Sequence, residues 1–210
     1  MVRWQPDARG RLQEAAMTLF FERGYDAVTV ADIAEHAGLT KRSFFNHFAD
    51  KREVVFASLD AFEASVLTAL IKANSDLDPL DAAVSAFTQA AAPLADYPEI
   101  ARARRALIDS SSELKERELV KMASTTAAVA DALVRRGVPQ RDATFVSQAA
   151  STVFTTAVDE WTRDPQPGLA SSIPTALNDL LAALGSERRG AVLLDQGSAR
   201  DRQRSDDLTP

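Results

Sequence analysis

Residues 29–51 read TVADIAEHAGLTKRSFFNHFADK, and this segment shapes the interpretation of the whole chain. Its first part predicts a short helix, because Thr29 can cap a helix with Asp32 three residues on, and apolar residues then recur at helical spacing. Gly38 stands where that helix must end, since glycine tolerates the left-handed backbone of a C′ position. Thr40 can cap a second helix directly afterwards. The segment therefore predicts two short helices joined by a tight turn.

The second of these helices has two chemically different faces. Phe44 and Phe48 are four residues apart, so both side chains should point inward. The outward side chains suit DNA, since Arg and Lys bind guanine and phosphates, Asn binds adenine and Ser binds either base. These outward residues are Lys41, Arg42, Ser43, Asn46 and His47. Asp50 can cap a third helix, which puts Lys51 in a first turn that favours a phosphate. This pattern is typical of a helix-turn-helix that reads DNA.

Residues 9–56 resemble the N-terminal part of the tetracycline-repressor (TetR) type of bacterial transcriptional regulators. That family has a helix containing A-A-x-x-L-F, then G-Y or G-F, a Thr, I-A-x-x-A-G, an aromatic residue, x, H-F and a Lys. The matching residues here are Ala15, Ala16, Leu19, Phe20, Gly24, Tyr25, Thr29, Ile33, Ala34, Ala37, Gly38, Phe45, His47, Phe48 and Lys51.

The resemblance implies a role for each matching position. Thr29, His47 and Lys51 fall where the family contacts phosphates. The positions from which the family usually reads bases hold Thr40, Lys41, Arg42, Ser43 and Asn46. Phe45 stands where the family most often has Tyr, so a hydroxyl bond to phosphate is missing, although the ring can still pack against the DNA backbone. The resemblance also implies a homodimer on a palindromic operator in double-stranded DNA, most often a repressor that a ligand releases.

Composition and charge set limits on the function. A chain of 210 residues with 46% hydrophobic content can bury a core, and the absence of Cys excludes disulfides and thiolate metal sites. No run approaches the roughly 18 apolar residues of a membrane span, and the first residues lack a signal-peptide core, so we expect a cytoplasmic protein without a membrane partner. Residues 1–56 hold eight Lys and Arg and eight Asp and Glu, so DNA binding must depend on local placement of charge.

Beyond residue 50, apolar residues recur at a period near 3.6, which predicts an all-α protein with about nine helices. We expect one long connecting helix over 51–73 and further helices over about 79–92, 99–109, 112–137, 140–163 and 174–184. The expected organisation is a three-helix helix-turn-helix domain over 1–50, a helical effector and dimerisation domain over 51–185, and a disordered polar tail over 186–210.

The last two expected helices are candidates for the dimer interface. Small residues there allow close approach of helices, and larger apolar residues supply buried area. The candidate residues are Val146, Ala149, Ala150, Val153, Ala157, Trp161, Leu177, Leu180, Leu181 and Leu184. The alternative is that these residues only pack within their own chain.

The middle helices should enclose a pocket for a small apolar effector, whose binding would tilt the 51–73 helix. Expected lining residues are Phe62, Phe87, Arg105, Gln148, Thr152, Phe154, Thr155 and Trp161. Residues 102–161, which contain RARRALIDSSSELKER, LVRRG and a helix ending in Trp161, also resemble the C-terminal half of mycofactocin-type regulators. That subgroup is associated with acyl-CoA-like ligands, and Arg102, Arg104 or Arg105 would then meet an anionic head group. The alternative for each residue is a place in an ordinary core or on a solvated face.

An enzyme is a competing class of function. The chain contains no G-x-S-x-G, P-loop, G-x-G-x-x-G or H-E-x-x-H motif, and both histidines lie in the predicted DNA-binding segment. We therefore predict a protein that is not an enzyme, with no catalytic residue, cofactor or metal site. A further alternative, an all-helical carrier or sensor of small apolar ligands without a DNA role, stays open.

Overall fold

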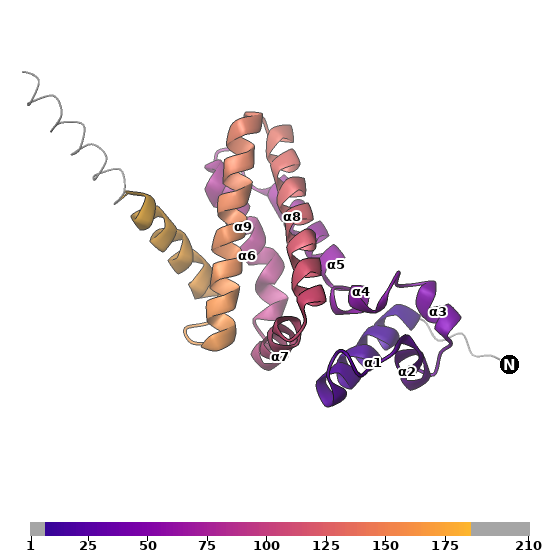
Figure 1. Ribbon diagram of the computed structural model, residues 1–210. Helices are drawn as coiled ribbons and strands as arrows, with labels where there is room; N and C mark the ends of the chain where they lie inside the picture. The colour runs from indigo at the N-terminus through magenta and orange to yellow at the C-terminus, as the bar shows by residue number, and fades with distance from the viewer. Residues whose placement is uncertain (1–6, 186–210) are drawn as a thin grey trace, which may run out of the picture.

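The computed structural model describes residues 7–185, and every regular element in that range is helical. No strand occurs among these residues, so the all-α prediction is confirmed. Figure 1 shows a small N-terminal group of helices, in indigo and purple, beside a taller bundle.

The N-terminal group consists of four helices around one apolar core. They are α1 (Ala8–Arg23), α2 (Val30–His36), α3 (Lys41–Phe45) and α4 (Lys51–Val55). Helix α1 packs against each of the other three, and its Leu12, Leu19 and Phe20 side chains are buried beneath them. Ile33 of α2 and Phe44 of α3 join the same core, which fixes the orientation of α3 on α1.

The remaining helices form the bundle. They are α5 (Leu59–Lys72), α6 (Pro79–Ala91), the 3-10 turn η1 (Ala92–Leu94), α7 (Pro98–Asp109), α8 (Ser112–Arg135), α9 (Gln140–Arg163) and a last helix over 169–185. Helices α5, α6, α9 and α8 close a ring, since each packs against the next, and α7 lies at the end of the bundle nearest α1 (Figure 1). Phe87 and Phe154 stack at 5.1 Å between ring centroids in the core of this ring.

The predicted starts and stops of α6, α7, α8 and α9 agree with the structure to within two residues. Asp78 caps α6, because its Oδ1 accepts a hydrogen bond of 2.9 Å from the amide of Leu80, and Pro79 occupies N1. Gly137 follows α8 with φ +93°, a left-handed conformation that favours glycine. Local capping signals were therefore sufficient to place these ends.

The prediction of a single long helix over 51–73 was wrong, because the structure divides this segment into α4 and α5. The described residues therefore contain ten α-helices rather than the nine predicted. Helix α4 ends at Val55, and the chain then makes three-residue turns in which the Phe56 amide bonds to Glu53 and the Leu59 amide to Phe56. Phe56 is fully buried in the N-terminal core, whereas Val66 and Leu70 of α5 face the bundle core. Because of this break, the segment 51–72 contributes side chains to both the N-terminal core and the bundle core. A single straight helix would not place them in both.

The C-terminal end also differs from the expectation. The last helix begins at residue 169, five residues earlier than expected, because Leu169 and Ile173 bury against the bundle. The disordered tail predicted over 186–210 lies outside the described residues.

Helix α4 is joined to the bundle by both apolar and ionic contacts. Leu107 and Ile108 of α7 and Leu114 of α8 belong to the N-terminal core. The Glu53 carboxylate of α4 pairs with the guanidinium of Arg117 and, at 3.3 Å, with the ammonium of Lys121, both on α8. The position of α4 is therefore tied to α7 and α8.

Candidate nucleic-acid interface

Helix α2 begins with the predicted capping box. The Asp32 amide donates to Thr29 Oγ1 at 3.2 Å, and the Thr29 amide donates to Asp32 Oδ2 at 2.8 Å. The hydrogen bonds that the hydroxyl and then the amide of Thr29 donate to Asp32 lower the pKa of the Asp32 carboxyl, so the cap is charged at neutral pH. The Thr29 hydroxyl also donates to Asp32 at 2.6 Å, which holds this side chain at the start of the helix.

The turn between α2 and α3 is a Schellman motif. The Leu39 amide donates to the Ala34 carbonyl at 2.7 Å, and the Gly38 amide donates to the Glu35 carbonyl at 2.9 Å. Gly38 has φ +66°, and a Cβ added there would lie 3.1 Å from Nη2 of Arg11, which itself bonds to the carbonyl of Ala37. The left-handed backbone angle therefore favours glycine at this position, and a larger residue would also have to shift the Arg11 side chain.

Helix α3 presents the predicted polar face to solvent. Thr40 caps it by accepting a hydrogen bond of 3.1 Å from the Ser43 amide. Phe44 and Phe48 are buried, whereas the opposite face is exposed. That exposed face carries Lys41, Arg42, Asn46 and His47, with Ser43 partly exposed beside them. Within residues 7–185, Lys41 and Arg42 form no ion pair, so both positive charges are free to meet an anion.

Two predicted DNA contacts near the C-terminal end of α3, Phe45 and His47, also have exposed side chains. Phe45 is 57% exposed, and its ring lies edge-on to Phe44 with centroids 5.5 Å apart. The His47 side chain is exposed, while its carbonyl accepts a bond of 3.1 Å from the Arg9 guanidinium on α1. Arg9 also lies over the Phe48 ring at 4.7 Å. Helix α1 therefore supports the C-terminal end of α3 from behind.

Lys51 has internal partners that the sequence did not suggest. Its ammonium donates to the carbonyls of Tyr25 at 2.8 Å and Val28 at 2.9 Å, and lies 3.9 Å from the Tyr25 ring centroid. Burial lowers the pKa of the Lys51 ammonium and raises the pKa of Tyr25 to about 12. Two of the three ammonium donors are thus used to hold the α1–α2 connection, and one remains for a phosphate.

Lys51→Ala should consequently reduce stability as well as any DNA affinity. The substitution leaves two carbonyls without their charged donor, so we expect the free energy of unfolding to fall by about 1–3 kcal/mol in urea titrations. Lys41→Ala is the matched control, because Lys41 is exposed and unpaired, and should change it by less than about 0.5 kcal/mol. Equal urea midpoints for the two variants would show that the Lys51 contacts contribute nothing to stability.

The residues predicted to line an effector pocket are not gathered around one cavity. Phe154 stacks on both Phe62 and Phe87, with ring centroids 5.1 Å apart in each pair. These three rings fill the bundle core together with buried Trp161. On α9, Gln148 and Thr152 are exposed, while the Thr155 hydroxyl donates to the Ser151 carbonyl at 3.0 Å. Arg105, the last of the eight predicted residues, lines a cavity elsewhere in the bundle.

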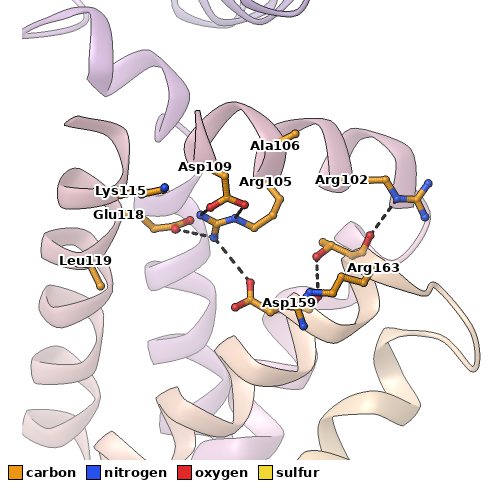
Figure 2. Close-up of a pocket in the computed structure, with 10 residues that line it drawn as sticks. Arg102, Arg105, Ala106, Asp109, Lys115, Glu118, Leu119, Asp159 and Arg163 are labelled. Atoms are coloured by element: carbon orange, nitrogen blue, oxygen red, sulfur yellow. Dashed lines mark hydrogen bonds and ion pairs between the residues drawn. The ribbon is translucent and has the colours of Figure 1, made fainter. Parts of the chain in front are cut away.

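That cavity lies between α7, α8 and α9 and has a volume of about 710 Å³ (Figure 2). Its cationic side chains are Arg102, Arg105, Lys115 and Arg163. The sequence indicated the arginines of segment 102–105 as possible partners of an anionic head group, and the structure places Arg102 and Arg105 in this cavity. Lys115 and Arg163 were not predicted, because they come from two other helices.

The ten expected dimer residues divide into four that are buried, two that are exposed and four that are partly buried, the last being Val146, Ala149, Leu177 and Leu180. Ala150, Val153, Ala157 and Trp161 are buried in the bundle core of their own chain, so the intramolecular alternative is correct for these four. Leu181 and Leu184 of the last helix are exposed, as is Phe145 of α9, which was not among the predicted interface residues.

Within residues 7–185, no helix combines the length and hydropathy needed to cross a bilayer.

Two families match this chain over separate regions. Residues 12–57 match the family described as "Bacterial regulatory proteins, tetR family", and residues 77–185 match the "MftR C-terminal domain". The first region contains the capped helices and turn described above, and the second covers about half of the chain and most of the bundle.

Curated relatives match mainly in the N-terminal region. The HTH-type transcriptional repressor KstR2 of Mycobacterium tuberculosis is 48% identical over 54 residues, which cover 26% of this chain and 27% of that protein. The HTH-type transcriptional regulator TcmR of Streptomyces glaucescens is 38% identical over 79 residues, covering 38% and 35%. The chain thus spans about a third of the length of these relatives.

Among solved structures, SmeT, the repressor of the Stenotrophomonas maltophilia multidrug efflux pump SmeDEF, shares the fold. The TM-score is 0.55 at 20% identity, over 84% of this chain and 89% of that one. At this identity the likeness concerns the fold alone.

Proposed function

Because the chain belongs to the tetR family of bacterial regulatory proteins, we propose that it is a transcriptional regulator that reads DNA with α3. The observation that supports this most directly is the polar face of α3, where Lys41 and Arg42 are exposed and unpaired while Phe44 anchors the opposite face. A helix held in this way can enter a major groove without unfolding or breaking internal ion pairs.

The proposed DNA-binding unit comprises residues 1–50 together with α4, since Val54, Val55 and Phe56 bury in the N-terminal core. Residues from α5 to 185 form the proposed effector and dimerisation unit. The proposed DNA contacts are Thr29, Thr40, Lys41, Arg42, Ser43, Phe45, Asn46, His47 and Lys51. Of these, Arg42 and Asn46 are assigned to bases, and Lys51 to a phosphate through its remaining donor.

We propose that the regulator acts as a homodimer on a palindromic operator. One helix as short as α3 contacts few base pairs, whereas a two-fold pair reads half-sites spaced by one helical turn or more. The exposed Phe145, Leu181 and Leu184 side chains lie on α9 and the last helix, the two expected to pair. Burial of these three side chains in a dimer would remove large apolar groups from water.

Regulation by a small molecule completes the proposal. A ligand that binds one arrangement of the two units better than the other would change the separation of the α3 helices in the dimer. Release of a repressor from DNA is the outcome we propose, and an acyl-CoA-like effector is the ligand class to be tested first. Action on the chromosome also implies a cytoplasmic location.

A DNA-binding titration tests the proposal. The purified chain should form a sequence-dependent complex with DNA upstream of its own gene in fluorescence anisotropy, and weaker complexes with scrambled DNA of equal length. Because phosphate contacts release counterions, affinity should fall by about 10³-fold or more between 50 and 200 mM salt if six or more phosphates are contacted. A carrier or an enzyme would give no salt-sensitive, sequence-dependent complex with any DNA from a random pool.

A further inference from the structure

The cavity between α7, α8 and α9 is positively charged relative to the rest of the chain. Its wall holds four cationic side chains and three carboxylates, whereas the whole chain has a net charge of −6. Lys115 and Arg163 form no ion pair within residues 7–185, so two of the four cations have no partner. Ala106 and the 72% exposed Leu119 add an apolar portion to the wall. An anion with an apolar chain matches this combination.

One carboxylate in the wall is shared by two neighbouring arginines. Glu118 Oε2 accepts from Arg105 Nη1 at 2.7 Å, and Glu118 Oε1 lies 3.5 Å from Arg104 Nη1. Arg105 has alternative partners, since Asp109 and Asp159 lie 3.2 and 3.8 Å away (Figure 2). Among the described residues, Arg104 pairs with no other carboxylate. Glu118 is therefore held mainly by Arg105, at the expense of Arg104.

Arg104 connects this pair to the DNA-binding unit. Its guanidinium carbon lies 5.4 Å from the ring centroid of Phe56, the buried residue that directly follows α4. Its Nη2 atom is buried and has no hydrogen-bond partner. Because an unsatisfied buried donor costs free energy, this guanidinium would gain from a closer carboxylate.

We propose that the cavity binds a small carboxylate or phosphate carried on an apolar chain, and that Glu118 transmits its binding to α4; this inference rests on the proposed regulatory function. The anion pairs with Arg105 and displaces Glu118. The freed carboxylate moves onto Arg104 and satisfies its buried donor. The contact between Arg104 and Phe56 then changes, and with it the placement of α4 on α8. The ligand and DNA thus each favour a different position of Glu118. This difference couples the binding of the ligand to the binding of DNA.

Calorimetry with three probes of equal chain length tests the site. Octanoate and octyl phosphate should bind the parent protein, and whichever binds more tightly identifies the head group. Octanol, which lacks the charge, should bind at least about tenfold more weakly than the better anion. Equal binding of octanol and both anions would show that the cavity does not select for charge and would overturn the proposal.

Substitutions test whether the anion binds in this cavity or at cationic side chains elsewhere on the protein. Arg105→Gln should weaken binding of the better anion by about tenfold or more, whereas Lys72→Gln on α5, outside the cavity, should leave it unchanged. Asp159→Asn removes a competitor for Arg105 without touching Arg104, and should tighten binding. Unchanged affinity in Arg105→Gln would refute the assignment.

The transmission step is tested by DNA affinity. In the parent protein, saturating anion should lower affinity for the selected DNA by about 5-fold or more. Glu118→Gln should abolish that response, and it should tighten anion binding because it removes the nearest competitor for Arg105. Asp159→Asn, which retains Glu118 and Arg104, should keep the response and serves if Glu118→Gln does not fold. An anion that binds through Arg105 without changing DNA affinity would overturn the role of Glu118. Absence of any DNA complex without ligand would instead refute the proposed function, leaving the calorimetric result as an independent test of the cavity.

Discussion

Phe44→Ala should lower the free energy of unfolding by about 3–5 kcal/mol, the range for removing a fully buried aromatic side chain. Phe44 is 0% exposed and packs against Phe48 with ring centroids 5.5 Å apart. It is also the residue that fixes the inner face of α3 to α1, so the cavity left by the truncation would loosen the proposed recognition helix itself. Denaturant unfolding should show the loss directly, and DNA affinity should fall with it.

Phe45→Ala is the matched control for this prediction. Phe45 is the next residue in the same helix and the same residue type, but it is 57% exposed. Its truncation should change stability by less than about 1 kcal/mol, while any effect on DNA affinity would report the proposed contact with the sugar and backbone. Similar unfolding free energies for the two alanine variants would contradict the inward orientation of Phe44.

Local signals were enough to predict most of the N-terminal group. The cap at Thr29, the left-handed turn at Gly38 and the four-residue spacing of Phe44 and Phe48 each depend on residues close in sequence. Such interactions are encoded by the segment itself, so hydrogen-bonding chemistry and helical period suffice to place them. The exposed polar face of α3 follows from the same spacing.

Interactions between distant segments could not be predicted in this way. Lys51 bonds to carbonyls more than twenty residues earlier, and Glu118 is shared by arginines on another helix. A periodic pattern indicates that a helix has an apolar face, but does not identify the helix against which that face packs. For this reason the sequence predicts Gln148 and Thr152 in an interior pocket, although both lie on the exposed face of α9. The break after α4 has the same origin, because Phe56 is drawn into a core formed partly by α7 and α8.

Arg42→Ala should produce the largest specific loss of DNA affinity. The side chain is exposed and forms no ion pair within residues 7–185, so its removal should leave the free energy of unfolding within about 0.5 kcal/mol of the parent. A bidentate contact between arginine and guanine is worth about 1–3 kcal/mol, and a dimer contains two copies. The expected total of about 2–6 kcal/mol corresponds to roughly 30-fold to more than 10⁴-fold weaker binding in anisotropy titrations.

The pattern of that loss distinguishes base reading from phosphate binding. If Arg42 contacts a base, the variant should lose its preference at one position of each half-site, while weakly bound non-specific DNA should be little affected. If it contacts a phosphate, all sequences should weaken alike and the salt slope should fall by about one per contact. Lys72→Ala on α5 removes one positive charge from the bundle and should leave both the preference and the slope unchanged. A uniform loss in Arg42→Ala would therefore move this residue from the base contacts to the phosphate contacts, and Asn46, one turn further along the exposed face of α3, would become the main candidate for base reading.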